Sequence, residues 1–222
     1  MTQDGGRYVR VVCMGDSITF GQHIDPARRW TTHVEHRLHS RFGDSRVDVI
    51  NRGVSGETTR MGLERFPASV QNEEPDVVTI QFGMNDCNCW QTDHGLPRVR
   101  INAFRENLIE MVERSRKFGA REVILSTNPR TMRRTPMVSG EIYEEANAHY
   151  SEVMREVAHI TESQLCDIQH AFADLDDREL EKMLLPAPDL LHLSEAGNLF
   201  YANVISPYVE RAVDAVTSER ER

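Results

Sequence analysis

The segment YVRVVCMGDSITFG, residues 8–21, decides the fold expected for this chain. It joins a Val-rich run, residues 8–14, to a glycine and small polar residues, the pattern of a buried strand that leads into a helix. Similar apolar runs follow at residues 47–50, 77–82, 122–126 and, more weakly, 164–168. Short runs of this kind are typical of strands that are covered on both faces in a parallel sheet.

Helical patterns separate these runs along the whole chain. Apolar residues recur every three or four positions in segments that contain Trp30, Ile101 and Tyr150. The last helix is expected to begin at Ser194, a good N-cap residue, and to be kinked or divided at Pro207. This alternation predicts a single α/β domain over residues 1–222, a three-layer αβα sandwich with a parallel five-stranded sheet.

The composition is that of an ordinary soluble globular protein and argues against several classes of partner. Hydrophobic residues make up 39% of the chain and charged residues 27%. The net charge of −9 argues against binding to nucleic acid or to anionic membranes. No apolar run approaches the roughly 18 residues of a membrane-spanning helix, so we expect no membrane insertion. The N-terminal segment lacks the apolar stretch of a signal peptide, and we expect a cytoplasmic protein.

The cysteine and histidine patterns predict no metal site. Cys87 and Cys89 form a C-x-C that no second pair completes, and we expect all four cysteines to be free thiols in a reducing compartment. His33, His36 and His39 follow one another at intervals of three, which fits a solvated helix face better than a helical zinc site.

Polar segments follow the predicted strands, at the edge where open α/β sheets bind their ligands. The first three strands lead into GDSIT, NRGVSGET and GMND, which begin at Gly15, Asn51 and Gly83. A fourth segment, DLLH at residues 189–192, precedes the last predicted helix. We therefore expect these four segments to form one site.

These segments hold the groups that a serine needs in order to hydrolyse an ester. Ser17 supplies a hydroxyl, and His192 supplies a base that removes its proton. Asp189, three residues before His192, is placed to orient the imidazole. The Asn85 amide and the Gly56 backbone N–H are candidate donors to the oxyanion of the tetrahedral intermediate.

The four segments resemble the conserved blocks of the GDSL/SGNH hydrolase superfamily, in the same order, over residues 15–192. The resemblance implies a flavodoxin-like sandwich with about five parallel strands, without cofactor or metal. It implies Ser17 as nucleophile and His192 as general base, supported by Asp189. It also implies an oxyanion hole formed by the Ser17 N–H, the Gly56 N–H and the Asn85 side chain.

Several neighbouring residues are candidates for contact with the substrate. Asp16 is expected mainly to orient the active-site loops by hydrogen bonds. Met84 stands where many members of the superfamily have a small residue, so its bulk is expected to narrow the site. Trp90 and His94 follow Asn85, and the sequence is equally compatible with a place in the pocket and with surface packing. A basic cluster after the fourth strand is expected to be solvated, with binding of a substrate carboxylate or phosphate as the alternative: Arg130, Arg133 and Arg134.

The sequence therefore predicts a serine esterase whose partner is a small-molecule ester with a short acyl group, such as acetyl. The alternative within this class is a lysophospholipase or acyl-thioesterase that acts on longer chains. Thr19 excludes the G-x-S-x-G elbow of the α/β-hydrolases. The alternative of another class is a ligand-binding flavodoxin-like module, although the chain contains no glycine-rich phosphate loop. A catalytically inactive scaffold is a third reading, which the complete set of site residues disfavours. The oligomeric state stays open, a homo-oligomer included.

Overall fold

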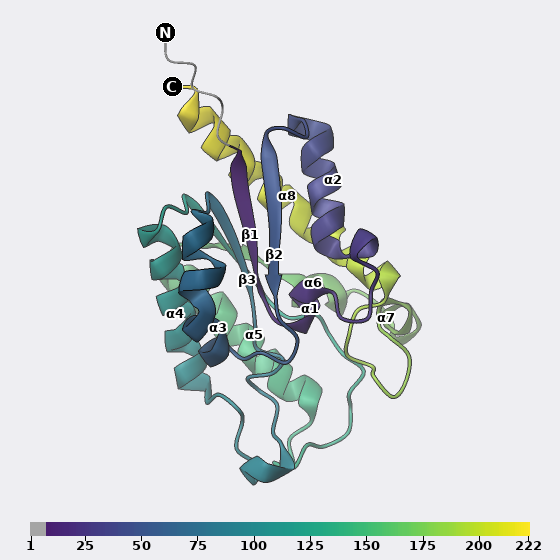
Figure 1. Ribbon diagram of the computed structural model, residues 1–222. Helices are drawn as coiled ribbons and strands as arrows, with labels where there is room; N and C mark the ends of the chain where they lie inside the picture. The colour runs from purple at the N-terminus through teal and green to yellow at the C-terminus, as the bar shows by residue number, and fades with distance from the viewer. Residues whose placement is uncertain (1–7) are drawn as a thin grey trace.

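The computed structural model describes residues 8–222, which build a five-stranded parallel sheet in the order β2-β1-β3-β4-β5 (Figure 1). The strands are β1 Val9–Gly15, β2 Val47–Gly53, β3 Val77–Gln81, β4 Glu122–Ser126 and β5 Gln164–Cys166. The predicted absence of a signal peptide concerns in part residues 1–7, which lie outside the described residues.

The five apolar runs correspond to the five strands, with shifts of a few residues at their ends. The largest shift is in β2, which continues through Asn51 and Arg52 to Gly53 because these residues pair with the end of β1. Polar side chains carry no strand signal, so the extension was not predicted. As an edge strand, β2 is also less buried than the central β3, whose residues are all buried.

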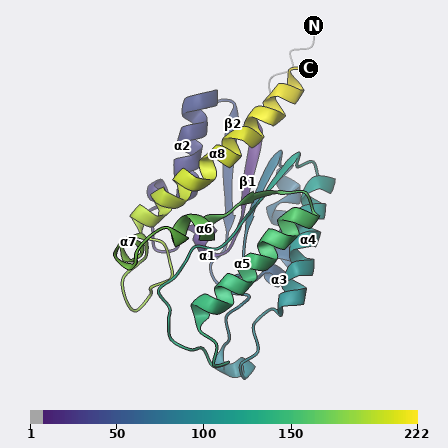
Figure 2. The same cartoon turned by 180° about the vertical axis from the view of Figure 1, so that it is seen from behind.

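Helices cover both faces of the sheet and give the predicted three layers (Figures 1 and 2). Helices α3, α4 and α5 lie on one face, and α2 and α8 lie on the other. Their bounds are α2 Trp30–Phe42, α3 Thr59–Ser69, α4 Ile101–Lys117, α5 Tyr143–Ile160 and α8 Glu195–Arg220. Shorter helices precede or connect them: α1 Ser17–Phe20, α6 Ile168–Ala173 and α7 Asp177–Met183.

The last helix begins where the sequence predicts and continues past Pro207. Ser194 is its N-cap, as expected, and its hydroxyl accepts a hydrogen bond from the Gly197 N–H at 3.1 Å. The helix runs unbroken through Pro207, so the proline does not divide it, and the alternative of a kink stays a prediction. A proline inside a helix costs about 3 kcal/mol, mainly through one lost hydrogen bond and a steric clash. The burial of apolar residues on both sides of the proline, including Ile205 and Val209, offsets this cost.

The carboxyl ends of β1, β2 and β3 meet at one edge of the sheet and position the polar segments. Gly15 pairs with Gly53 on one side and with Gln81 on the other. A Cβ atom on Gly53 would lie 2.2 Å from the backbone nitrogen of Phe20, so only glycine allows α1 to sit against the end of β2. The nucleophile candidate at the start of α1 is thereby fixed at the centre of this edge.

The cysteines are buried, and the three histidines at intervals of three lie on α2. All four cysteines are free and buried. His33, His36 and His39 lie on α2, where the His39 Nε2 atom is 3.0 Å from the Val47 carbonyl oxygen. Among residues 8–222, no helix combines the length and the apolar character that crossing a membrane requires.

Candidate active site

Ser17, His192 and Asp189 form a continuous hydrogen-bonded chain, although 175 positions separate the serine from the histidine. The His192 Nε2 atom lies 3.0 Å from the Ser17 hydroxyl oxygen, and the His192 Nδ1 atom lies 2.7 Å from Asp189 Oδ2. A carboxylate only accepts hydrogen bonds, so Nδ1 carries the proton and Nε2 presents its lone pair to the serine hydroxyl. This is the arrangement in which a histidine removes a proton from a serine.

Asp189 holds the loop of His192 as well as its ring. Its Oδ1 atom accepts the backbone N–H groups of Leu191 at 3.0 Å and of His192 at 2.7 Å. Partial burial raises the pKa of Asp189, but hydrogen bonds from the His192 side chain and from both backbone N–H groups outweigh this effect and leave the pKa below its usual value. The aspartate is therefore ionised at neutral pH, as its role beside an imidazole requires.

Ser17 is the first residue of α1, and Asp16 is the N-cap of that helix. The Asp16 Oδ1 atom accepts the Ile18 N–H at 2.9 Å. Its Oδ2 atom lies 3.5 Å from the Gln81 amide nitrogen and 3.4 Å from the Asn85 amide nitrogen. Asp16 has no exposed surface, so these contacts match the expected orienting role better than direct contact with a substrate.

Asn85 and Gly56, the candidate oxyanion donors, lie in the loops that follow β3 and β2. Asn85 is partly buried and reaches Asp16, the neighbour of Ser17. Gly56 is exposed and has φ +80°, a left-handed conformation that favours glycine. Its N–H has no hydrogen-bond acceptor within the part of the chain that the structure describes. A Cβ on Gly56 would meet no atom within 4 Å, so space does not require a glycine there.

Asp86 anchors the glycine loop from the side of β3. Its Oδ1 atom accepts both the backbone N–H of Thr59, at 2.9 Å, and the Thr59 hydroxyl. Thr59 is the first residue of α3, so this contact fixes the end of the loop that carries Gly56. Burial raises the pKa of Asp86 to about 6, although the hydrogen bonds from Thr59 oppose the shift.

The remaining candidates for substrate contact differ in burial: Met84 is buried, whereas Trp90 and His94 are exposed. Met84 packs in the hydrophobic core with 2% of its surface exposed, so it offers a substrate almost no surface. Trp90 is 52% exposed, and the Arg98 guanidinium lies 4.2 Å from the centre of its ring. His94 is exposed in the same loop and has a left-handed backbone.

The basic cluster after β4 binds groups of the protein itself. Arg130 donates to the carbonyls of Phe172 and Leu175, and Arg134 forms an ion pair with Asp177. The Arg133 Nε atom donates to the Asp189 carbonyl oxygen at 2.9 Å and supports the histidine loop. These contacts disfavour the alternative that the cluster is a site for an anionic substrate group: Arg130, Arg133 and Arg134.

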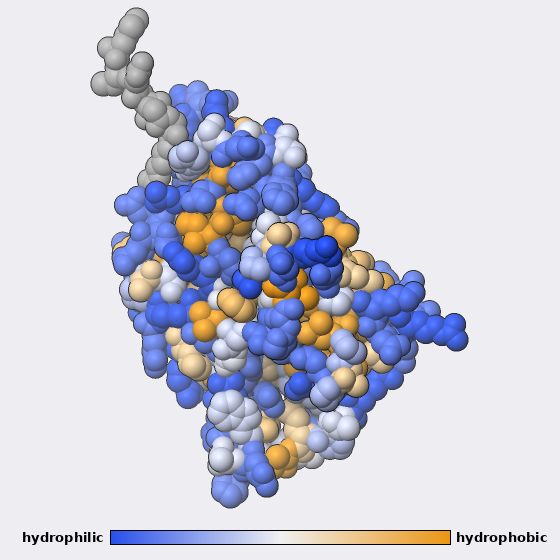
Figure 3. All heavy atoms as spheres, turned by 45° about the vertical axis from the view of Figure 1, so that its right-hand side comes forward, coloured by the Kyte–Doolittle hydropathy of each residue, from blue (hydrophilic) through white to orange (hydrophobic). Residues whose placement is uncertain are grey.

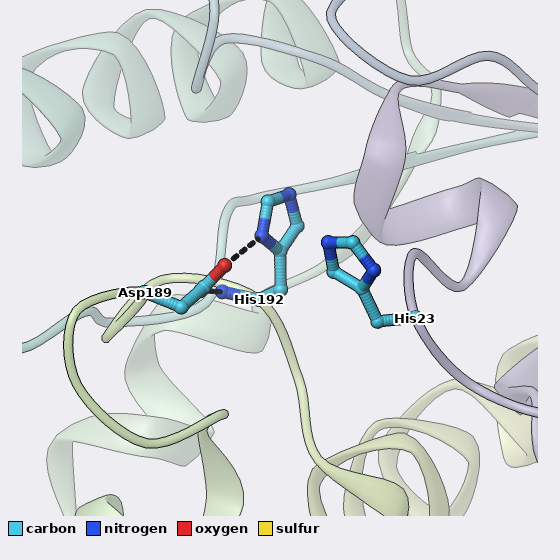
Figure 4. Close-up of side chains that lie close together, drawn as sticks. All are labelled: His23, Asp189 and His192. Atoms are coloured by element: carbon cyan, nitrogen blue, oxygen red, sulfur yellow. Dashed lines mark hydrogen bonds and ion pairs between the residues drawn. The ribbon is translucent and has the colours of Figure 1, made fainter.

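Two residues at the site were missed by sequence reasoning. His23 lies beside His192, with the ring centres 5.8 Å apart and the rings edge to face (Figure 4). Its position six residues after Ser17, in a loop at the same edge, was the available signal. Arg98 donates to the Gly56 carbonyl oxygen at 2.9 Å and so joins the loops after β2 and β3. No sequence motif marks Arg98, because this contact spans 42 positions.

Comparisons with known proteins identify the family and the fold of the chain. Residues 13–199 match the GDSL-like lipase/acylhydrolase family. The chain is 32% identical to the uncharacterized lipoprotein YqeF of Bacillus subtilis over 131 residues, 57% of this chain and 51% of that protein. It is 27% identical to an acetylxylan esterase of Geobacillus stearothermophilus over 219 residues, 87% of this chain and 90% of that protein.

A solved structure shows the same fold over nearly the whole length of both chains. The lipase/acylhydrolase from Enterococcus faecalis superposes with a TM-score of 0.73 and 28% identity, covering 90% of this chain and 94% of the other. The matches to the first three curated relatives span only about half of the length of those proteins. The family match, in contrast, covers most of the present chain, from the end of β1 to the start of α8. The chain belongs to the GDSL-like lipase/acylhydrolase family.

Proposed function

We propose that this protein hydrolyses carboxylic esters through an acyl-enzyme intermediate on Ser17. The observation that carries the proposal is the hydrogen-bonded chain from the Ser17 hydroxyl through His192 to Asp189, with distances of 3.0 and 2.7 Å. Family membership supports it independently, since the family comprises lipases and acylhydrolases.

The reaction proceeds in two steps at the same residues. The Ser17 oxygen attacks the carbonyl carbon of the ester while its proton passes to His192 Nε2. Asp189 stabilises the imidazolium, which then gives the proton to the departing alcohol oxygen and leaves the acyl group on Ser17. In the second step a water molecule attacks the acyl carbon and loses a proton to His192. His192 passes this proton to the Ser17 oxygen as the bond to the acyl carbon breaks, which releases the acid and restores the Ser17 hydroxyl.

The negative charge of each tetrahedral intermediate requires donors that are already in place. We assign this role to the Ser17 N–H, the Gly56 N–H and the Asn85 side-chain amide. The contact from Asn85 to Asp16 and the contact from Arg98 to Gly56 support the assignment, because each restrains a proposed donor at the sheet edge.

A short acyl group, such as acetyl, is the proposed substrate feature. The relative that matches over nearly its full length is named an acetylxylan esterase, which favours acetyl esters among the alternatives. On the face that Figure 3 shows, hydrophobic side chains gather in separate patches among hydrophilic ones and form no continuous apolar surface. Long acyl chains, as in a lysophospholipase or thioesterase, remain the alternative. A cytoplasmic location stays a prediction, and one relative is a lipoprotein.

A series of p-nitrophenyl esters with increasing acyl length, tested on the wild type and on Ser17→Ala, examines both parts of the proposal. We expect kcat/KM to be highest for acetate or butyrate and the serine variant to be inactive with every ester. A preference for octanoate or longer esters contradicts the proposed acyl length. Full activity of Ser17→Ala contradicts the proposed nucleophile.

A further inference from the structure

His23, His192 and Asp189 direct their side chains toward one another at the surface of the candidate active site (Figure 4). One nitrogen or oxygen atom from each residue lies within 4.8 Å of the other two. His23 is exposed, and the other two residues are partly exposed, so ions in solution reach all three. Two imidazoles and a carboxylate are the ligand types that zinc takes in proteins.

The backbone of His23 is held next to the nucleophile by a tight turn. The Gln22 N–H donates to the Ser17 carbonyl oxygen at 3.0 Å, and the Ile24 N–H donates to the Gly21 carbonyl oxygen at 3.1 Å. His23 itself has φ +64°, a conformation that residues other than glycine adopt infrequently. The turn therefore fixes where the exposed His23 side chain starts, next to the loop of the nucleophile.

The nitrogen of His23 that faces this group is available as a ligand. The Gln22 side-chain nitrogen lies 3.2 Å from His23 Nε2, and an amide nitrogen only donates hydrogen bonds. The His23 Nε2 atom is thus the acceptor and carries a lone pair. A metal ion that binds this lone pair replaces one exposed hydrogen bond, the one from the Gln22 side chain.

We propose that His23, His192 and Asp189 bind Zn²⁺, or a transition-metal ion of similar ligand preference, as a reversible inhibitory site. The inhibition, though not the binding, rests on the proposed role of His192 as general base. This ion is not a cofactor, because it takes groups that the proposed reaction needs.

The ion replaces the proton between His192 Nδ1 and Asp189 Oδ2, which lie 2.7 Å apart. The displaced proton moves to His192 Nε2, so the imidazole stays neutral and no proton is released. Zinc bonds of about 2.0–2.2 Å place tetrahedral ligand atoms about 3.3 Å apart, so the His23 nitrogen has to approach by at most about 1.5 Å. A water molecule completes the four ligands. The proton on Nε2 then faces Ser17, and His192 is unable to accept the serine proton.

Isothermal titration of ZnCl₂ into the Ser17→Ala variant measures binding without any turnover. We expect one ion per chain, with an affinity that falls at least about tenfold in Ser17→Ala/His23→Asn, since even loss of an indirect partner of a metal commonly costs this much. Asparagine is chosen because it tolerates the left-handed backbone of His23. His149→Asn is the matched control, because His149 is exposed on α5 and pairs with Glu141 instead. No binding, or equal binding after His23→Asn, overturns the proposal.

Ester hydrolysis by the Ser17-containing protein tests the inhibitory effect. We expect Zn²⁺ to inhibit the wild type, EDTA to restore its rate, and the inhibitory concentration to rise at least about tenfold in His23→Asn. Mg²⁺, which prefers oxygen ligands, is expected to have no effect. Equal inhibition of the wild type and His23→Asn contradicts the inhibitory site. If neither protein hydrolyses any ester, the proposed function fails, whereas the titration still decides whether the metal site exists.

Discussion

Asp16 is a carboxylic acid with no exposed surface that lies directly beside the proposed nucleophile. Burial raises its pKa to about 7, and the nearby Asp86 adds to the shift, while the Ile18 N–H and the Gln81 and Asn85 amides oppose it. Three donors reach the Asp16 carboxyl group, yet burial keeps its charged form costly. We interpret Asp16 as a positioning residue: its burial destabilises the charged form, but its carboxyl group orients the Asn85 amide.

The raised pKa predicts how the stability of Asp16→Asn depends on pH. The folded protein keeps the Asp16 proton up to about pH 7, whereas the unfolded chain loses it near its ordinary pKa of 3.8. Stability from this group therefore falls as pH rises from about 4 to 7. Asparagine does not titrate, so the melting temperature of Asp16→Asn relative to wild type should rise between pH 5 and pH 8. A difference that is independent of pH contradicts the shift.

Asn85 tests the oxyanion hole at the level of one side chain. Asn85→Ala should lower kcat by roughly 10²- to 10³-fold, the effect of losing one oxyanion donor, and change KM much less. Steady-state kinetics with p-nitrophenyl acetate measures both constants, and a melting curve checks that the variant is folded. A change in kcat below about threefold removes Asn85 from the proposed hole.

Among the structural elements, the loops that follow β2 and β3 are linked to each other by Arg98. It donates to the Gly56 carbonyl oxygen at 2.9 Å while its guanidinium stacks on Trp90 at 4.2 Å. Residues 54–56 of the loop after β2 are exposed, and the Val54 N–H and the Ser55 hydroxyl bind Gly15 and Gln22 on the side of α1. The bond from Arg98 and the contact of Thr59 with Asp86 hold the loop from the side of β3.

Arg98→Ala should consequently lower kcat by about tenfold, which corresponds to the roughly 1.4 kcal/mol of one lost hydrogen bond to a charged group. KM and the melting temperature should change little, because the loop is at the surface. Arg105→Ala is the control, since Arg105 forms only a surface ion pair with Glu156. An unchanged kcat in Arg98→Ala shows that Gly56 needs no such support.

For the whole molecule, one hydrophobic core extends through the sheet and its covering helices. Trp30 illustrates the connection. Its backbone N–H donates to Asn198 of α8 at 3.0 Å, and its indole N–H donates to the Ile18 carbonyl oxygen at 3.1 Å in α1. The proposed nucleophile, the second helix and the last helix thus meet around one buried side chain.

This single core predicts one cooperative unfolding transition. In a Trp90→Phe variant, Trp30 is the remaining tryptophan and reports on the core, while far-UV circular dichroism reports on all helices. The two signals should give the same melting temperature. Two separate transitions contradict the prediction of a single domain.

Much of the architecture was predictable because burial leaves a local mark on the sequence. Short apolar runs, four of them strong and the fifth weak, predicted the five strands, and Ser194 predicted the start of α8. Pro207 does not divide α8, because packing along the whole helix outweighs the local cost of the proline. Asp176 and Glu179 form a capping box at the start of α7, a short helix that no apolar periodicity predicts.

The site was predictable only where its residues fall in ordered motifs. His23 and Arg98 belong to no motif, and their contacts with His192 and Gly56 depend on how separate loops meet in space. A single sequence contains no signal for such contacts. The burial of Met84 was equally hidden, because a residue in a polar block gives no sign that it points into the core.

Mass spectrometry of peptides from protein quenched during turnover of p-nitrophenyl acetate tests directly whether Ser17 forms a covalent acyl intermediate. We expect one acetyl group per chain on the peptide that contains Ser17, and none in Ser17→Ala. Turnover of the ester by folded protein, with the acetyl group on another residue or on none, would contradict a covalent intermediate on Ser17.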